Sequence, residues 1–192
     1  MTAAAGIRDH SGWAVLVVLG GPATEPTLLE RRRLTLCPDD LPRQAFHAAA
    51  ACGSPEEAAD LVARVEQAVA AACRDAIADL PPGTTVAVGV SPSRLPADLA
   101  DILAAHPLLH AAEGDLYRRH LVAAAESAGA GVVRYSPKTV TAEAAAAVGT
   151  QPQVLEGRLR ELGRAVGPPW QQDHRTAAAA AVLGLATARD PR

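Results

Sequence analysis

The order of apolar and polar positions predicts three strands at the start of the chain. Residues 3–8 are small and apolar, and residues 13–19 form a continuous apolar run rich in β-branched side chains, which is typical of a buried strand. Residues 27–36 predict a third, more exposed strand. Turn residues at 9–12 and 20–22 separate these segments, so we expect an antiparallel meander.

Helical periodicity begins after an expected irregular connection over residues 38–53. Ser54 precedes a proline and two glutamates, a sequence typical of a capped helix start. Apolar residues then recur at intervals of three and four, which predicts an amphipathic helix to about Asp79. The apolar segment 85–90 predicts a second buried strand, followed by a loop over 91–96.

The remaining chain predicts mostly helices. The expected helical segments are 99–128 with a break near His106-Pro107, then 139–148, 151–165 and 171–188, with a short strand over 131–135 before the last three. We expect residues 1–188 to form a single domain and residues 189–192 to be a frayed tail. The predicted fold class is α/β, with a mixed five-stranded sheet of three antiparallel N-terminal strands and two later parallel strands, flanked by helices.

Composition narrows the class of protein. The 192 residues suit one domain, and the net charge of −3 argues against a strongly basic nucleic-acid binder. The three cysteines show no CxxC spacing, which argues against a disulfide framework and a zinc ribbon. The first ten residues do not resemble a signal peptide, and no apolar stretch is long enough to span a bilayer. These features predict a cytoplasmic protein with reduced thiols and no membrane association.

Three segments occur in the order found in a known family. Residues 6–15 read GIRDHSGWAV, residues 132–140 read VVRYSPKTV, and Asp173-His174 precede an alanine-rich helix. In this order the chain resembles the ribonuclease H-like superfamily, and within it the RuvC resolvase branch. The resemblance implies a ribonuclease H-like fold and cleavage of phosphodiesters with Mg²⁺ or Mn²⁺ held by carboxylates.

The resemblance places catalytic, metal-binding carboxylates at the end of the first strand, on the fourth strand and at the start of the last helix. Asp9 and Asp173 occupy the first and last of these places, but Arg8 interrupts the first-strand pattern and residues 84–95 contain no acid. Other roles are open for both residues, because aspartate also stabilises turns and the first turn of a helix.

Glu113 is the candidate replacement for the missing carboxylate. It shares a helix face with His106 and His110, which could hold a metal or could arise by chance. Gly114 follows it inside a predicted helix and needs a local reason, such as close packing or a nearby ligand. His174 is a further candidate metal ligand, with a surface position as the alternative.

Arg31, Arg33, Lys138 and Trp170 are the candidate nucleic-acid-binding residues. A solvated strand face is the alternative for the arginines, and a role in covering the core is the alternative for Trp170.

Two functions follow from these candidate residues and from the resemblance. The first is a metal-dependent endonuclease acting on structured DNA. The second is an inactive ribonuclease H-like module that binds a partner protein or forms a homodimer, with the alanine-rich helix faces as the expected interface.

Overall fold

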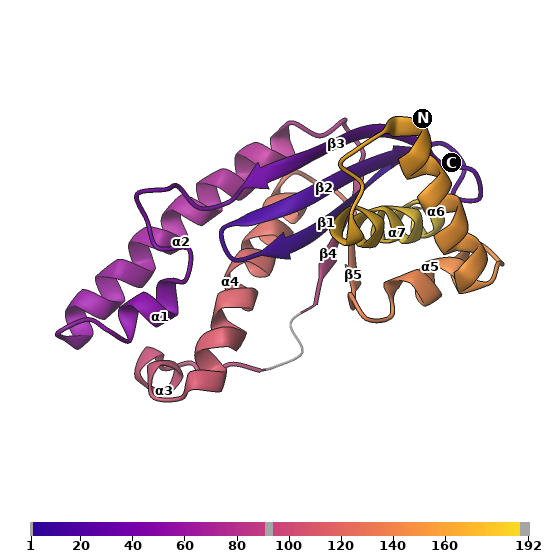
Figure 1. Ribbon diagram of the computed structural model, residues 1–192. Coiled ribbons are helices and arrows are strands. Elements are labelled where there is room, and N and C mark those ends of the chain that lie inside the picture. Colours follow the sequence, from indigo (N-terminus) through magenta and orange to yellow (C-terminus); the bar gives the residue numbers. More distant parts are fainter. Residues whose placement is uncertain (1, 91–93, 189–192) are drawn as a thin grey trace.

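A computed structural model describes residues 2–90 and 94–188 of the chain (Figure 1). The expected tail at 189–192 and residues 91–93 of the expected loop lie outside the described residues. The strands are β1 (Ala3–His10), β2 (Trp13–Gly20), β3 (Thr27–Thr35), β4 (Thr85–Gly89) and β5 (Val132–Tyr135). The helices are α1 (Ala45–Ala49), α2 (Pro55–Ala78), α3 (Leu99–Leu103), α4 (His106–Ser127), α5 (Val140–Ala147), α6 (Pro152–Val166) and α7 (Gln172–Thr187).

The five strands form one mixed sheet in the order β3-β2-β1-β4-β5. β1, β2 and β3 pair antiparallel, whereas β4 runs parallel to both β1 and β5. This arrangement confirms the predicted α/β class, because the hairpins of the first three strands require antiparallel pairing and the later helical crossovers allow parallel pairing.

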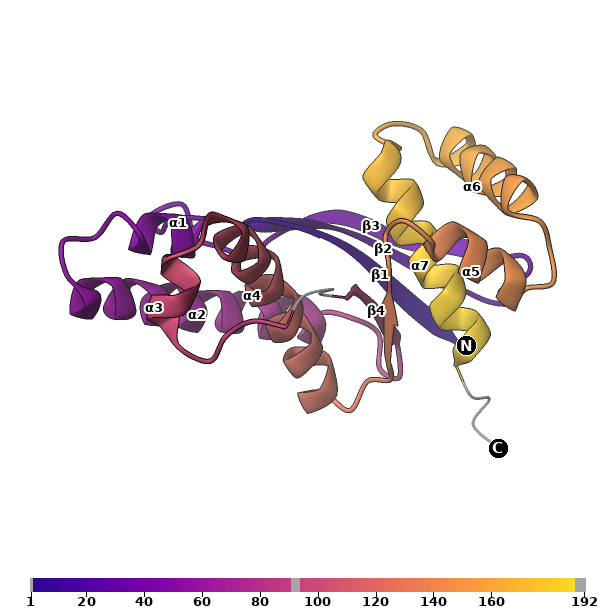
Figure 2. The same cartoon turned by 90° about the horizontal axis from the view of Figure 1, so that it is seen from below.

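The two faces of the sheet are covered by different groups of helices. α2 and α4 lie on one side, and α7 with α5 and α6 lies on the other (Figure 2). Successive side chains of a strand point to opposite faces. On β1, Ala5 and Ile7 therefore pack with α2 and α4, whereas Ala4 packs with α7.

The alanine-rich part of α7 lies directly on the sheet. Residues 177–181 are fully buried, and the carbonyl oxygen of Ala177 approaches Gly6 so closely that a Cβ at Gly6 would lie 1.8 Å from it. Small side chains allow this close approach of helix and strand. The alanine face of α7 is therefore part of the core, so it does not offer the exposed surface that we expected for a second copy.

Local sequence signals agree with most element boundaries. The Ser54 hydroxyl accepts a hydrogen bond from the amide of Glu57 at 3.2 Å and caps α2 as predicted. A break separates α3 from α4 before Pro107, also as predicted. Two details differ from the expectation: α1 forms inside the segment 38–53, and β1 continues through Asp9 and His10 before the turn at Ser11 and Gly12. None of the helices in the described ranges combines the length and hydrophobicity needed to cross a bilayer.

Candidate functional site

Asp9 lies at the carboxyl end of β1 and is bound by an arginine from α4. Its side chain is 3% exposed, and its Oδ2 accepts a hydrogen bond from Nε of Arg118 at 2.8 Å. The same guanidinium donates through Nη1 to the carbonyl oxygen of Val90 at 3.1 Å. Arg118 therefore neutralises the buried carboxylate and links α4 to the ends of β1 and β4.

Two glycines leave room for the Arg118 side chain. A Cβ at Gly89 would lie 3.0 Å from Oδ1 of Asp9 and 3.4 Å from Nε of Arg118. A Cβ at Gly114, one helical turn before Arg118, would lie 3.4 Å from its Nη1. Glycine inside a helix costs about 1 kcal/mol relative to alanine, and close packing of the guanidinium supplies the local reason for Gly114. The end of β4, where the resemblance predicts an acid, therefore has Gly89 next to Arg118.

Asp173 lies in the first turn of α7 and contacts two basic residues of β1. Its Oδ2 lies 3.0 Å from Nε2 of His10, and its Oδ1 lies 3.7 Å from Nε of Arg8. Arg8 and His10 follow the same side of β1 as Ala4, because strand side chains alternate. Arg8 and His10, and not Asp9, are thus the residues of β1 that meet the acid of α7.

Tyr135 lies close to the charged groups of Asp9, Arg118, Arg8 and Asp173. Its hydroxyl is buried and donates to the carbonyl oxygen of Ile7 at 2.7 Å. Burial is the main cause that raises the pKa of Tyr135; the Asp9 carboxylate raises it further, whereas Arg8 and Arg118 act in the opposite direction. Two acids and two arginines therefore compensate each other's charge around the ends of β1, β4 and β5.

The residues of this centre do not fit a carboxylate-bound pair of divalent metals. Mg²⁺ needs several oxygen ligands in near-octahedral geometry. Asp9 already pairs with Arg118, β4 contributes Gly89, and Asp173 faces two basic side chains. Among the described residues Oδ1 of Asp9 finds no hydrogen-bond partner, and a single oxygen does not make a magnesium site. The expected Mg²⁺ or Mn²⁺ site therefore lacks its ligand set in this geometry.

Glu113 occupies a different part of the protein. Its side chain is 4% exposed, and its Oε1 accepts hydrogen bonds from the backbone amides of Phe46 at 2.8 Å and His47 at 3.1 Å. The ring Nδ1 of His47 lies 3.3 Å from the same oxygen. These contacts place Glu113 at the start of α1, where it satisfies amides that a helix leaves without partners. None of its hydrogen bonds within the described residues joins it to Asp9 or Asp173.

His174 forms part of the cap of α7. Its Nδ1 accepts a hydrogen bond from the backbone amide of Gln171 at 3.2 Å, and its ring lies 5.9 Å from that of Trp170 in a tilted arrangement. Burial lowers the pKa of His174, and the charge of Arg31 lowers it further. The metal-ligand role that we predicted for His174 stays a prediction.

The candidate nucleic-acid-binding arginines have partners within the protein. Arg31 donates hydrogen bonds to four successive carbonyl oxygens of residues 166–169 at 2.7–3.5 Å, so it holds the loop before α7. The guanidinium carbon of Arg33 lies 3.9 Å above the Trp13 ring, which stacks on His10 at a centroid distance of 4.2 Å. Their binding roles stay predictions.

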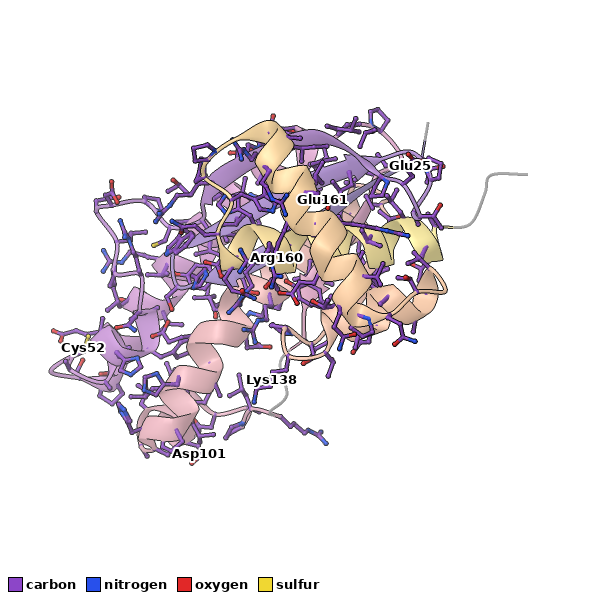
Figure 3. The ribbon with its side chains drawn as sticks, turned by 45° about the vertical axis from the view of Figure 1, so that its right-hand side comes forward. Glu25, Cys52, Asp101, Lys138, Arg160 and Glu161 are labelled. Atoms are coloured by element: carbon purple, nitrogen blue, oxygen red, sulfur yellow. The ribbon has the colours of Figure 1, made fainter. Side chains whose placement is uncertain are left out.

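The other two candidate nucleic-acid-binding residues, Lys138 and Trp170, line grooves beside α6 and α7. Figure 3 shows Arg160 on α6 and also labels Lys138. One groove, of about 480 Å³, combines three arginines with Trp170; its lining residues are Arg160, Gly163, Arg164, Gly167, Pro168, Trp170 and Arg175. A neighbouring groove of about 290 Å³ is bordered by Lys138 and again by Arg175. The Arg160-Arg164-Arg175-Trp170 set, here called the arginine groove, places cationic donors beside a half-buried aromatic ring that also packs against the core and Gly163.

Sequence reasoning missed the residues that decide the chemistry of the centre. Arg118 was not among the predicted site residues, and His10 was predicted only as part of the turn at 9–12. The available signal was Gly114, which lies four residues before Arg118 and so on the same helix face.

Comparison with known proteins identifies the fold. No family model matches the chain, and no curated protein matches it. Among solved structures, it is similar to Thermus thermophilus RuvC in complex with a Holliday junction substrate, with a TM-score of 0.53 and 17% identity over 95% of this chain and 92% of that one. A second Thermus thermophilus RuvC structure matches with a TM-score of 0.50 and 16% identity over the same shares. The chain therefore has a RuvC-like ribonuclease H fold, and at this identity the likeness concerns the fold alone.

Proposed function

We propose that this protein is a RuvC-like DNA-binding protein that recognises structured DNA and does not cleave it by two-metal catalysis. The observation that carries the proposal is the ion pair between buried Asp9 and Arg118. A guanidinium supplies positive charge beside the carboxylate, as a metal ion would, but it cannot generate a hydroxide nucleophile from a bound water.

The charges of the centre support the non-catalytic part of the proposal. Metal-assisted cleavage requires carboxylates that converge on the ions. Here Arg8 meets Asp173, Arg118 meets Asp9, and Gly89 stands on β4. A metal would have to displace Arg118 and leave this partly buried arginine without its partner, which is unfavourable.

The arginine groove supports the DNA-binding part. Arginine donates two parallel hydrogen bonds to phosphate, and an aromatic ring can stack on an exposed base. Arg160 and Arg164 are exposed on α6, and Arg31 holds the adjoining loop in place. The RuvC structure of similar fold is a complex with a Holliday junction, which makes a four-way junction the first DNA to test.

The test measures binding and cleavage on the same junction. Fluorescence anisotropy with a labelled four-way junction and a matched duplex, in EDTA at rising salt, should show tighter binding of the junction and a linear fall of log affinity with log salt. Incubation with Mg²⁺ or Mn²⁺ should leave the junction uncut. Metal-dependent cleavage that is lost in Asp173→Asn would overturn the non-catalytic part and identify the protein as a nuclease.

A pair of double variants locates the DNA surface. Arg160→Ala/Arg164→Ala should weaken binding and reduce the salt slope by about 2, because two phosphate contacts are removed. Arg64→Ala/Arg74→Ala, which removes two exposed arginines of α2, is the matched control and should bind as the wild type does. An equal loss of DNA affinity in both double variants would mean that net charge alone, and not the arginine groove, determines binding. If the wild type does not bind DNA at low salt, DNA is rejected as the ligand.

A further inference from the structure

Three histidines converge at the junction of α1 and the first turns of α4. His47 comes from α1, and His106 and His110 come from α4 at a spacing of four residues. One ring nitrogen of each lies within 4.8 Å of the others, and no other group of three or more His, Cys, Asp or Glu side chains meets this condition in the described part of the chain. Figure 2 shows α1, α3 and the start of α4 together at the end of the molecule opposite α6.

The distances are close to those of a metal site. Nε2 of His106 lies 3.1 Å from Nε2 of His110. Tetrahedral Zn²⁺ with Zn–N bonds of about 2.0–2.1 Å places its ligand nitrogens about 3.4 Å apart. The His106–His110 pair therefore needs almost no change to share an ion. One ring nitrogen of His47 lies within 4.8 Å of those of both partners, so rotation of these imidazoles can bring in the third nitrogen.

Glu113 orients the third histidine. Its Oε1 lies 3.3 Å from Nδ1 of His47 and also accepts hydrogen bonds from two backbone amides, so the carboxylate is held in place. A carboxylate accepts a hydrogen bond from Nδ1–H, which keeps the ring proton on Nδ1 and leaves Nε2 with a free lone pair. Metal-binding histidines commonly have such a carboxylate behind them, which fixes the tautomer and increases ligand basicity.

We propose that His47, His106 and His110 form a Zn²⁺ site in which Glu113 positions His47. Three imidazoles with no directly coordinating carboxylate select a transition metal over Mg²⁺. His106 and His110 are exposed, which leaves the fourth coordination position open to water. The ion would join α1 to α4. His110 lies eight residues before Arg118, about 12 Å along the helix axis, so this site is separate from the Asp9 centre.

Titration of the metal-free protein with Zn²⁺ tests the site without DNA. Isothermal calorimetry should give one Zn²⁺ per chain, and substitution with Co²⁺ should give the visible absorption of a four-coordinate ion. His106→Ala/His110→Ala removes two exposed side chains, so it should fold normally and lose both signals. His120→Gln, which removes a histidine of α4 about 15 Å along the helix axis from His110, is the matched control and should keep both.

Glu113→Gln separates positioning from ligation. It should weaken Zn²⁺ binding about 10–100-fold and keep the Co²⁺ spectrum, because the three nitrogens remain. At a hundredfold excess of Zn²⁺ over Kd, the Tm of the wild type should rise by about 5–10 °C, and that of His106→Ala/His110→Ala should not change. The proposal is wrong if the wild type does not bind Zn²⁺, or if the double variant binds it with the affinity of the wild type. Either result leaves the DNA-binding proposal unaffected, because that test is made in EDTA.

Discussion

At the scale of single residues, the charge partners of Asp9 and Asp173 decide what the centre can do. A buried carboxylate needs a counter-charge, which a nuclease of this fold would supply with metal ions and which this chain supplies with Arg118. Arg8 likewise supplies a counter-charge to Asp173, at a longer distance of 3.7 Å between Nε and Oδ1. The acids at two of the expected places are therefore compatible with a centre that binds no metal.

Removal of Arg118 should strongly destabilise the fold. Arg118→Met leaves the Asp9 carboxylate buried without its partner, which we expect to reduce the free energy of unfolding by about 3–5 kcal/mol. Urea denaturation followed by circular dichroism measures this change. Asp9→Asn in the same chain removes the uncompensated charge, so the double variant should recover most of the loss. A loss below about 1 kcal/mol in the single variant would mean that the ion pair is not a main source of stability.

The three thiols should differ in reactivity. Burial raises the pKa of the Cys73 thiol to about 12, and the buried Cys37 thiol also has a raised pKa. Cys52 is half-buried and lies at the tip of the molecule beyond α1 (Figure 3). Because the thiolate is the reactive species, a disulfide reagent at pH 8 should modify Cys52 first and reach the other two only on unfolding. Fast modification of all three in the native protein would contradict the burial of Cys37 and Cys73.

At the scale of elements, the contact between β1 and α7 determines how the acid of α7 reaches the sheet. The absence of a side chain at Gly6 lets the backbone of α7 lie directly on the strand. This contact brings the first turn of α7, with Asp173, beside Arg8 and His10. The helix position therefore depends on a glycine several residues away from the charged groups.

Gly6→Ala should disturb this contact. Its Cβ would lie 1.8 Å from the carbonyl oxygen of Ala177, and a backbone atom cannot move aside as a flexible side chain can. We expect a loss of at least about 3 kcal/mol in the free energy of unfolding, at the upper end of overpacking effects. Gly157→Ala is the control, since a Cβ there meets none of the described residues within 4 Å, and the higher helix propensity of alanine should stabilise α6 by up to about 1 kcal/mol. Thermal denaturation of both variants compares them, and similar behaviour would argue against the close contact.

At the scale of the whole molecule, two half-buried histidines, His120 and His174, should make the fold sensitive to acid. Burial lowers the pKa of His120, and the charge of Arg119 lowers it further. The unfolded chain therefore takes up a proton at His120 before the folded chain does. The contribution of His120 to stability should be constant above about pH 7.5 and fall as the pH drops through the unfolded value of about 6.5. His174 has a pKa shift in the same direction.

His120→Gln tests this contribution. The variant should lose less stability than the wild type between pH 7.5 and pH 5.5, because one proton-uptake site of the unfolded chain is removed. Urea midpoints at the two pH values measure the difference. The same midpoint shift in both proteins would assign the acid sensitivity to other groups.

The sequence by itself determined the order and type of the main elements, the cap at Ser54, the helix break before Pro107 and the shared face of His106 and His110. These features depend on residues that are near neighbours along the chain, so periodicity and turn chemistry report them directly. The ribonuclease H-like order could be recognised for the same reason.

Only the tertiary structure decided which side chains meet. It paired Asp9 with Arg118, which is 109 residues later, and Asp173 with His10, which is 163 residues earlier. It also brought His47 to His106 and His110. β1 continues two residues beyond the expected end at Arg8, so Arg8 and Asp9 both lie within the strand and point to opposite faces, with Arg8 toward α7. Charge compensation and metal ligation depend on distances of a few ångströms between remote segments, and no local pattern in the chain contains that information.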